Sequence, residues 1–393
     1  MGKTILILGG GWGGLFVAHR LRGYVGQEHR IVIIEKNDKF SLGPSNLWVM
    51  TGDRQYPGDV ERSMSKLLRK DIELLHAEVT GIETETKKVH TSVGTFTGDY
   101  LVIALGSELY PEALPGFVEN AYNLYDLSSV ARLHEVLQQF TGGKIIVFCS
   151  ATPFRCPPAP YEAALLIESL FRNRGLKDKI EVHIYTPEKQ PMPVGGLKIG
   201  AMLRQMIENR GIKYHPEHKV LRIDGALRKM FFQDGIDAKY DLLIGIPPHR
   251  APRVVVEAGL TDSTGYIPTH PQTMRVLSDV ETLETKLPGI YVLGDVAAIT
   301  LLNSMLLPKA GVFAEEQASV IANSIAASIH EEESNKVFDG KGICYIETGD
   351  GMASTGSGEF YAYPEPRILI ESPSKEGHKA KEELEKLLTT WFA

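Results

Sequence analysis

A glycine turn between a short apolar strand and a helix constrains the fold of this chain more than any other feature. An apolar run at 4–8 precedes glycines in G-x-G-x-x-G spacing, namely Gly9, Gly11 and Gly14. We expect a helix from about Leu15 to Arg22, after which a second apolar strand, RIVIIEK, carries Glu35 near its end. In this order the glycines let the backbone approach a pyrophosphate, and the acid accepts hydrogen bonds from ribose hydroxyls. The pattern predicts a dinucleotide-binding α/β unit at the start of the chain.

Two later segments resemble further parts of an FAD domain. In LPGIYVLGDVAA, at 287–298, a buried strand ends in Gly294 and Asp295. This segment resembles the second FAD fingerprint of flavoproteins with two dinucleotide-binding domains, in which the aspartate binds the ribityl chain. The segment YLVIALGS, at 100–107, resembles the strand and turn where such chains leave the FAD domain. The three segments in this order predict FAD rather than NAD at the first glycine turn.

This resemblance implies cofactor contacts along much of the chain. The implied positions are Gly9, Gly11, Trp12, Gly13, Gly14, Glu35, Lys36, Asn46, Val79, Ala104, Gly106, Gly294, Asp295, Lys309 and Gly311. We therefore expect these residues to surround one bound FAD.

The middle of the chain repeats the α/β plan without the glycine loop. Strand and helix patterns alternate from KIIVFC through YEAALLIESLFRNRG, IEVHIYT and IGAMLRQMIENRG to KYDLLIGIPP. In relatives of glutathione reductase such a unit binds NAD(P)H through its own glycine loop. The corresponding loop here, CSATPFRCPPAP, has no glycine, and its prolines remove N–H donors that a pyrophosphate needs. We do not expect a working NAD(P)H site in this unit.

These patterns predict an α/β protein with two Rossmann-like dinucleotide-binding domains, as in glutathione reductase, and a small C-terminal α+β domain. The expected FAD domain is discontinuous, at 1–110 and 256–328, and the second Rossmann-like domain spans 111–255. The C-terminal domain spans 329–393, with a glycine-rich turn region, GDGMASTGSG, strands near GEFYAYP and PRILIES, and a final helix, HKAKEELEKLLTTWFA.

The overall charge and the apolar pattern exclude several classes of protein. A net charge of −7 disfavours a general nucleic-acid binder, because neutralising phosphates needs a basic face. No run of eighteen apolar residues predicts a spanning helix, and the first residues, KTILILGGG, lack an export signal. We expect a cytoplasmic protein, with peripheral attachment to the inner face of the cell membrane left open.

The three cysteines stand in different local contexts. Cys156 precedes prolines that suit the first turn of a helix, and both that helix end and Arg155 favour the thiolate. Cys149 ends an apolar strand, which indicates a place in the core. Cys344 fits either a small core residue in a strand or a partner of Cys156. Three cysteines are too few for a disulfide scaffold, so a disulfide here would be catalytic.

Several of these motifs together resemble the sulfide:quinone oxidoreductase family and the related flavoprotein subunit of flavocytochrome c sulfide dehydrogenase. The matching segments are GGGWGGL, PFRCPPAPYE, GIYVLGDVAAI, LPKAGVFAEEQA, CYIETGDG and the final helix. The resemblance implies a redox-active pair, Cys156 and Cys344, beside the flavin. Sulfide would attack their disulfide to give a persulfide, sulfur or polysulfide would leave, and electrons would pass through FAD to a second acceptor. No nicotinamide is needed, in agreement with the glycine-free loop.

The resemblance also assigns roles to two further residues. Lys309 corresponds to a lysine near the flavin N1 and C2 carbonyl, where a cation stabilises the reduced flavin. Glu162 corresponds to a carboxylate that relays protons near the sulfur, although an acid in a first helical turn also simply favours the helix dipole. Phe360, Tyr361 and Tyr363 fit either an acceptor pocket or a core. His215 and His218 indicate a solvated loop, and no cluster completes a metal site.

Two departures from the family pattern limit what is carried over. Many bacterial quinone-reducing members have a third catalytic cysteine, but YNLYDLSSV and its surroundings contain none. The cysteine that holds flavin covalently in flavocytochrome relatives corresponds to Gly43, before Pro44. We therefore expect non-covalent FAD.

The acceptor and the assembly state are less constrained. We expect a quinone, because the apolar loop LLNSMLLP before Lys309 could shield a lipophilic pocket. A soluble cytochrome c, a type II NADH dehydrogenase and a non-enzymatic flavoprotein are the alternatives. The final helix has an apolar face, formed by Leu384, Leu387, Leu388, Trp391 and Phe392, which fits either a membrane surface or its own domain. A homodimer is also left open.

Overall fold

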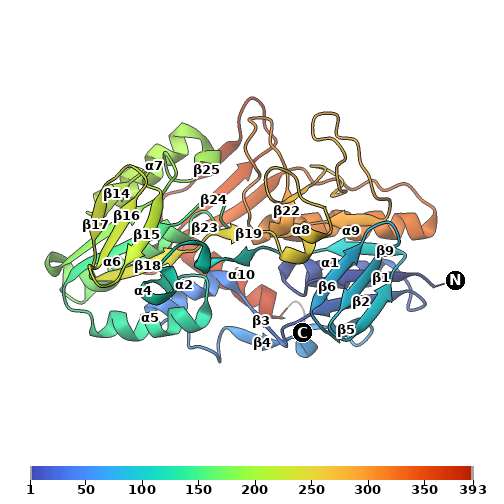
Figure 1. The fold of residues 1–393 in the computed structure, drawn as a ribbon, viewed down its shortest axis with the longest axis horizontal. Helices are drawn as coiled ribbons and strands as arrows, with labels where there is room; N and C mark the ends of the chain where they lie inside the picture. The colour runs from blue at the N-terminus through green and yellow to red at the C-terminus, as the bar shows by residue number, and fades with distance from the viewer. Residues whose placement is uncertain (1, 391–393) are drawn as a thin grey trace.

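The computed structural model describes the backbone of residues 2–390 and the side chains of residues 2–386. Its first half is built on a five-stranded parallel sheet in the order β21-β9-β1-β2-β5 (Figure 1). The strands are β1 (Thr4–Leu8), β2 (Arg30–Glu35), β5 (Glu73–His76), β9 (Tyr100–Ile103) and β21 (Ile290–Val292). Because β21 pairs with β9, residues far along the chain complete the N-terminal sheet.

Alternate residues of β1 face two different layers. Ile5 and Ile7 pack in one core with helices α1 and α9, and Leu6 and Leu8 pack in another core on the opposite face. The bounds are α1 (Trp12–Tyr24), α9 (Gly311–His330), β6 (Val79–Glu83), β7 (Lys88–Thr91), β8 (Gly94–Thr97) and α8 (Arg253–Glu257). A strand buried on both faces reads as a continuous apolar run, which is why the sequence at 4–8 shows no alternation.

A second parallel sheet, in the order β11-β18-β12-β13-β14, forms the other half. Its face with Ile145 and Val147 packs on helices, and its face with Ile146 and Phe148 packs on a three-stranded antiparallel sheet. The strands are β11 (Tyr122–Asn123), β12 (Gly143–Cys149), β13 (Ile180–Tyr185), β14 (Lys213–His215) and β18 (Leu242–Ile246). The covering elements are α4 (Phe117–Asn120), α5 (Leu127–Gln139), α6 (Ala159–Asn173), α7 (Gly196–Asn209), β15 (Val220–Asp224), β16 (Lys229–Phe232) and β17 (Asp237–Lys239).

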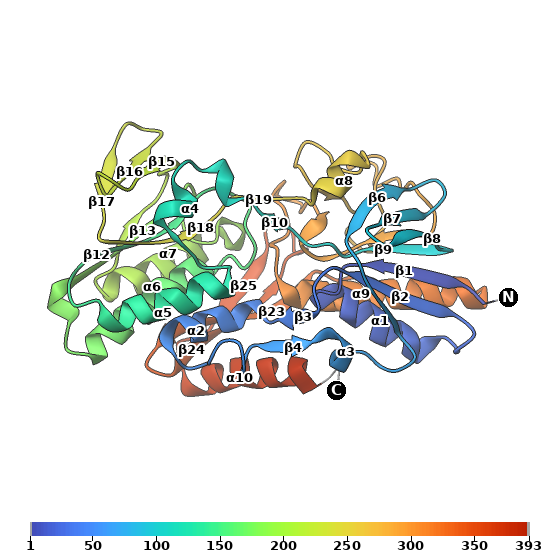
Figure 2. The same ribbon diagram turned by 60° about the horizontal axis from the view of Figure 1, so that its bottom comes forward.

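Short elements join and complete the two halves. The antiparallel pair β10 and β19 lies at the crossing between them (Figure 2). The remaining short elements are β3 (Lys39–Ser41), α2 (Asn46–Thr51), β4 (Glu61–Ser63), α3 (Met64–Leu67), β10 (Glu108–Leu109), β19 (His249–Arg250), β20 (Ile267–Pro268) and β22 (Ala297–Ala298). The sheets thus follow the expected α/β plan, and the exact domain limits remain a prediction.

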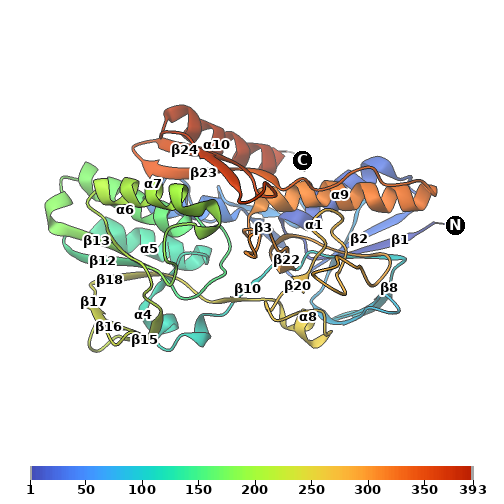
Figure 3. The same cartoon turned by 90° about the horizontal axis from the view of Figure 1, so that it is seen from above.

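The C-terminal segment forms an antiparallel sheet and a helix along one side of both halves (Figure 3). Its elements are β23 (Lys341–Gly349), β24 (Met352–Glu359), β25 (Arg367–Ile370) and α10 (Lys375–Thr390). Strand β23 packs against α6, and α10 packs against β24. This arrangement carries residues from the end of the sequence into the space between the two large sheets.

Two expected boundaries were wrong. Helix α1 begins at Trp12, directly after the glycine turn, instead of at Leu15. The expected glycine-rich turn region is mostly strand β24, because only Gly349, Asp350 and Gly351 have left-handed backbone angles, with φ of 84°, 59° and 65°. The other glycines of this strand leave room for neighbouring side chains. At Gly356, for example, a Cβ atom would lie 3.2 Å from the Cys344 sulfur.

Candidate active site

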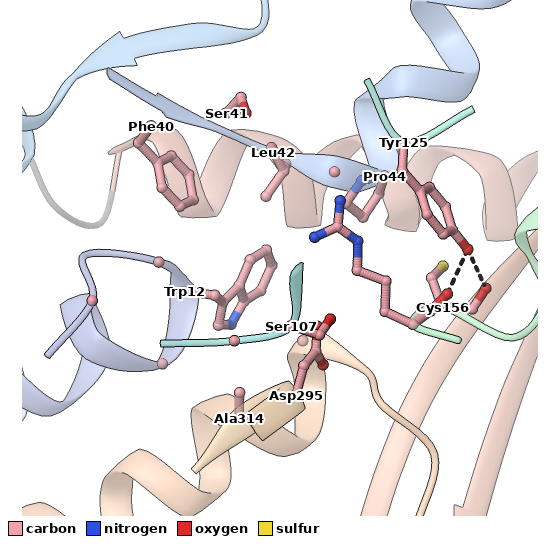
Figure 4. Close-up of a pocket in the computed structure, with 18 of the residues that line it drawn as sticks. Trp12, Phe40, Ser41, Leu42, Pro44, Ser107, Tyr125, Cys156, Asp295 and Ala314 are labelled. Carbon is pink, nitrogen blue, oxygen red and sulfur yellow. Dashed lines mark hydrogen bonds between the residues drawn. The ribbon is translucent and has the colours of Figure 1, made fainter. Parts of the chain in front are cut away.

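A cavity of about 830 Å³ opens where the two halves and the C-terminal segment meet. Figure 4 shows side chains from both halves turned toward it, among them Trp12, Tyr125 and Cys156. The cavity is lined by every residue predicted for the site except Gly14. These lining residues are Gly9, Gly11, Trp12, Gly13, Glu35, Lys36, Asn46, Val79, Ala104, Gly106, Cys156, Glu162, Gly294, Asp295, Lys309, Gly311 and Cys344.

The glycine turn and its acid form one end of the cavity. Gly9 has a φ of 101°, a conformation that side chains disfavour, and the Gly10 N–H donates to Glu35 Oε2 at 2.7 Å. Gly14 lies behind the turn, where a Cβ atom would be 2.0 Å from the carbonyl oxygen of Gly9. Gly14 therefore supports the turn by close packing of α1 instead of lining the cavity.

The lining of the cavity fits FAD. Two buried polar atoms on its wall, Trp12 Nε1 and Ser107 Oγ, have no hydrogen-bond partner within the described residues. Such atoms are normally satisfied, so they indicate a polar ligand. The volume is that of a small-molecule or cofactor site, and the glycine turn at the N-terminus of α1 provides N–H groups for a pyrophosphate. Glu35 at the end of β2 would hold the ribose.

Lys309 is a buried cation beside this cavity. Its residue is 5% exposed, and its Nζ donates to the carbonyl oxygens of Asp295 and, at 3.2 Å, Ala297. The Nζ also lies 3.5 Å from the centre of the Tyr266 ring. Burial lowers the pKa of Lys309 to about 8, although Asp295 acts in the opposite direction. The ammonium group is thus held by carbonyl dipoles and an aromatic face, with its charge only partly compensated.

The backbone of Lys309 also positions Cys156. The Cys156 N–H donates to the Lys309 carbonyl at 2.7 Å, and Arg155 forms an isolated parallel bridge with Lys309. Tyr125 Oη donates to the carbonyl oxygen of Arg155 and lies 3.4 Å from that of Cys156 (Figure 4). These contacts hold Cys156 at a φ of 51° just before α6. Two segments that are far apart in sequence therefore form one wall of the site.

The expectation that the local context favours the Cys156 thiolate was wrong. Burial raises the pKa of Cys156 to about 12, and Glu162 contributes in the same direction. Arg155 and a lysine of α10, Lys381, lower the pKa without offsetting burial. Cys156 stands three residues before α6 begins at Ala159, and burial of the thiol outweighs the favourable effect of the helix end.

Cys344 reaches the same cavity from strand β23. It pairs with Gly356 on β24, and burial raises its pKa to about 11, with Glu162 again acting in the same direction. All three cysteines are free thiols in the structure. The Cys156–Cys344 disulfide therefore stays a prediction, whereas Cys149 lies in the core at the end of β12, as expected.

Sequence analysis missed a group of charged residues beside the two thiols. Lys381 Nζ lies 2.7 Å from Glu162 Oε1 and 3.9 Å from Glu347 Oε1, and His378 Nδ1 lies 3.0 Å from Glu347 Oε1. Lys381 and His378 belong to α10, whose mixed Lys and Glu composition is typical of a solvated face. A helical spacing of three residues between them was the only available signal.

Other expected features lie away from the cavity. Phe360 packs on Phe313 in the core, Tyr361 Oη donates to the Pro271 carbonyl at 2.6 Å, and Tyr363 is 82% exposed. None of the three lines the large cavity, so they do not support an acceptor pocket there. His215 stacks on Tyr185 with ring centres 4.1 Å apart instead of lying in a solvated loop.

The apolar loop LLNSMLLP does not cover the cavity. Leu301 and Leu307 are buried in the core of the first half, and Leu302 is 67% exposed. None of its leucines lines the large cavity, but Leu307 and Pro308 line a second, small pocket beside Lys309, so a place of the loop over an acceptor pocket stays a prediction. The sequence shows only a run of leucines, and such a run is the same whether the loop covers a pocket or has some leucines in the core and others in solvent.

In the second half, the carboxylate in the position equivalent to Glu35 accepts a hydrogen bond from a tyrosine of the protein itself. Glu188 follows β13 much as Glu35 ends β2, but Tyr161 Oη of α6 donates to Glu188 Oε2 at 2.5 Å. Thr186 Oγ1 also donates to this carboxylate, at 3.3 Å. Burial raises the pKa of Glu188 to about 7. In this half the position that would hold a nucleotide ribose is already occupied by a side chain of the protein.

Replacing Glu188 with glutamine is expected to stabilise the protein at pH 8. The pKa of Glu188 is raised in the folded protein, from 4.5 to about 7. Between these two pH values the folded protein therefore keeps a proton on Glu188 that the unfolded chain has already lost. Stability is therefore lost as pH rises through 7, by up to about 3 kcal/mol. Glutamine avoids this cost, so the thermal midpoint should rise by several degrees at pH 8 and little at pH 5. An equal shift at both pH values, or the same shift in Glu217→Gln, would contradict this account.

Comparison with known proteins agrees with this architecture. Residues 3–319 match the model of the pyridine nucleotide-disulphide oxidoreductase family. The mitochondrial sulfide:quinone oxidoreductase of Dictyostelium discoideum is 25% identical over 88% of this chain and 75% of its own length. The X-ray structure of sulfide:quinone oxidoreductase from Aquifex aeolicus superposes with a TM-score of 0.85 at 22% identity, covering 98% of this chain and 90% of that one.

A type II NADH:quinone oxidoreductase of Staphylococcus aureus is also similar, at 29% identity, but over only 33% of each chain. The sulfide:quinone oxidoreductases match over a much larger part of both chains. The match to the family model, the two parallel sheets and the cavity that fits FAD agree with one another. The chain belongs to the pyridine nucleotide-disulphide oxidoreductase family.

Proposed function

We propose that this protein oxidises sulfide to sulfur or polysulfide and passes the electrons through FAD to a quinone. The observation that carries the proposal is the presence of two thiols, Cys156 and Cys344, on the wall of one cavity that also fits FAD. Cys156 stands just before α6 and Cys344 lies in β23, and these two elements pack against each other. The names of the similar proteins in Dictyostelium and Aquifex point to the same reaction.

In the proposed reaction a hydrosulfide ion attacks one sulfur of a Cys156–Cys344 disulfide. A new S–S bond forms between sulfide and that cysteine, the S–S bond between the cysteines breaks, and the other cysteine leaves as a thiolate. Lys381 lowers the pKa of both thiols, so its ammonium stabilises whichever thiolate forms. Bound FAD supplies the two-electron acceptor that reoxidises the pair.

Lys309 supports the cofactor in this proposal. Its ammonium group lies beside Asp295 of the second fingerprint, where negative charge on a reduced flavin would need a cation. The pKa of about 8 means that the residue is mostly protonated at neutral pH and could share a proton with the cofactor. Gly43 occupies the position of the covalent attachment cysteine, so we propose non-covalent FAD, which should stay in solution when acid precipitates the protein.

Several apolar side chains on the cavity wall support a lipophilic acceptor. Phe40, Leu42 and Pro44 lie together along one side in Figure 4, and Ile343 and Leu384 also line the cavity. A quinone ring is planar and apolar and would pack on such side chains. Cytochrome c, the alternative acceptor, is a protein, so it would need a docking surface on the outside of this protein instead of an apolar cavity wall.

Reduction by NADH, as in a type II dehydrogenase, is less well supported. The loop before α6 holds Cys156 and prolines in place of glycines, and Tyr161 occupies Glu188. These contacts leave neither the N–H groups for a pyrophosphate nor a free acid for a ribose.

An anaerobic mixing experiment tests the proposal. Oxidised protein is mixed with sulfide or with NADH, flavin absorbance is followed, and a short-chain quinone is then added. Sulfide should bleach the flavin within a turnover, NADH should not, and the quinone should restore the absorbance. Bleaching by NADH but not by sulfide would overturn the proposed function.

We also propose a cytoplasmic location, with peripheral contact to the inner face of the membrane and a homodimer as open alternatives. No helix among residues 2–390 is long and apolar enough to cross a membrane. The polar residues Lys381 and Glu385 of α10 are buried, and Leu384 lines the cavity, which supports packing of this helix on the protein itself. Of the expected apolar face, the side chains of Leu387 and Leu388, and all of Trp391 and Phe392, lie outside the described residues.

A further inference from the structure

A row of ionisable side chains leads from the cysteine cavity to the protein surface. Glu162 and Lys381 line the cavity together with Cys156 and Cys344. Glu347 lies behind them, on the same strand as Cys344, and does not line the cavity. His378, one turn before Lys381 on α10, comes last, and its side chain is 26% exposed. The row thus starts at the thiols and ends where water has access.

Consecutive members of the row are within reach of one another. Lys381 Nζ donates to Glu162 Oε1 at 2.7 Å, and the Glu347 N–H donates to the same oxygen at 2.9 Å. Lys381 Nζ is 3.9 Å from Glu347 Oε1, and His378 Nδ1 lies 3.0 and 3.1 Å from the two oxygens of Glu347. The largest separation, 3.9 Å, is about one ångström beyond a hydrogen bond and is closed by a small side-chain rotation.

The charges in this row do not match those of a simple buried ion pair. Glu162 and Glu347 are each 1% exposed and share one ammonium, and the second partner of Glu347 is the imidazole of His378. Burial raises the pKa of Glu347, which favours binding of a proton. Burial acts to lower the pKa of Lys381, but the two carboxylates outweigh it and raise the pKa. A protein that needed only stability would be better served by apolar residues at these positions.

The neighbouring charges are engaged elsewhere. Arg54 donates to Glu385 at 2.8 Å and to Glu382 at 3.3 Å, and Ser45 also donates to Glu385. The remaining neighbour, Trp48 of α2, lies edge-on to His378 with ring centres 6.0 Å apart. His378 and Glu347 are therefore paired with each other, and the path has a defined exit.

We propose that Glu162, Lys381, Glu347 and His378 carry protons from the sulfur atoms at Cys156 and Cys344 to water. In the step, the S–H bond of a cysteine thiol or persulfide breaks and an O–H bond forms on Glu162. Lys381 gives a proton to Glu347 as it receives one from Glu162, and so remains an ammonium. His378 takes the proton from Glu347 and releases it to water. No electrons move in these transfers.

The proposal rests on the proposed function, because sulfide oxidation is what loads protons on the sulfur. Oxidation of one hydrosulfide to sulfur releases one proton along with two electrons. Both thiols are half-buried on the cavity wall, and burial raises the pKa of each, so loss of the proton needs a nearby acceptor. A group that accepts this proton from the sulfur is therefore used in every turnover, and Glu162 at the start of the row can be that group.

Replacing His378 with alanine tests the path. Turnover with sulfide and a short-chain quinone should fall about tenfold or more in dilute buffer and recover when imidazole is added, because imidazole fits the vacated place and carries protons. The matched control is His90→Ala, since His90 forms an exposed pair with Glu83 at 2.7 Å far from the cavity. This control should keep wild-type turnover and should not respond to imidazole.

His378→Gln separates proton transfer from a structural role. Glutamine keeps a hydrogen bond to Glu347 but cannot carry a proton, so this variant should be as slow as His378→Ala and should show a larger solvent deuterium isotope effect than wild type. Wild-type turnover in His378→Gln, or a defect in His378→Ala that imidazole does not relieve, overturns the path. If the wild-type flavin is not bleached by sulfide at all, the proposed function fails instead, and the two failures are distinct.

Discussion

Changing Cys156 or Cys344 to serine is expected to slow reduction of the flavin by sulfide at least about a thousandfold. Both sulfur atoms face the same cavity, and each is needed to form the disulfide that sulfide attacks. A serine hydroxyl is nearly the same size but forms neither a disulfide nor a persulfide. The two variants should be equally impaired, since the thiols act as a unit. The rate of flavin bleaching after anaerobic mixing with sulfide measures the effect.

Cys149→Ala is the matched control for this experiment. Cys149 is fully buried at the end of β12 and does not line the cavity, so its replacement changes thiol content without touching the site. Its bleaching rate should stay within about a factor of two of wild type. Full activity in both Cys156→Ser and Cys344→Ser would remove the disulfide mechanism, whereas loss in Cys149→Ala alone would mean that the reactive thiol was wrongly assigned.

Changing Gly14 to alanine is expected to weaken FAD binding by about tenfold to a hundredfold. The added Cβ would lie 2.0 Å from the Gly9 carbonyl oxygen, so either α1 or the glycine turn must move. Overpacking of this kind costs about 1–3 kcal/mol, and 1.4 kcal/mol is a factor of ten in affinity. Because the displaced atoms belong to the turn that would hold the pyrophosphate, the cost should appear as lost cofactor. The FAD content of purified protein and its affinity on titration measure it.

Gly23→Ala provides the comparison on the same helix. A Cβ at Gly23 meets no atom within 4 Å, and alanine is the better helix former by roughly 0.5–1 kcal/mol. This variant should bind FAD as wild type does and unfold at a slightly higher temperature. Equal FAD affinity in Gly14→Ala and wild type would show that the close contact between α1 and the turn is not required.

The sequence was most informative where a function depends on neighbouring residues. The glycine spacing and Glu35 could be interpreted locally, because a turn, a helix start and a strand end follow each other within 35 residues. Gly294 and Asp295 were found in the same way, and all of them line the cavity. Gly14 was the exception, since spacing alone does not distinguish a residue that touches a ligand from one that supports the turn.

Residues brought together by long-range packing could not be predicted in this way. Lys381 looked like one of many charges on an exposed helix, but packing of α10 against β24 buries it beside Glu162. The pKa of Cys156 was misjudged for the same reason, because enclosure by distant segments outweighs the local helix end and Arg155. Phe360 and Leu307 do not line the large cavity, and the sequence could not decide this, because an apolar side chain gives the same signal in a core and in a pocket.

The position of α10 has a consequence for how the protein is made. The ribosome synthesises Cys156 long before Lys381, yet Lys381, which lowers the pKa of that thiol and lines the same cavity, belongs to α10. Until the residues of α10 emerge, the part of the cavity wall that this helix supplies is missing. Cys156 and Cys344 are then open to cellular oxidants and to other thiols. Domains fold from the N-terminus during synthesis, so the two large sheets are formed while this wall is still missing. A nascent chain is thus chemically vulnerable at the very residues on which the finished enzyme depends.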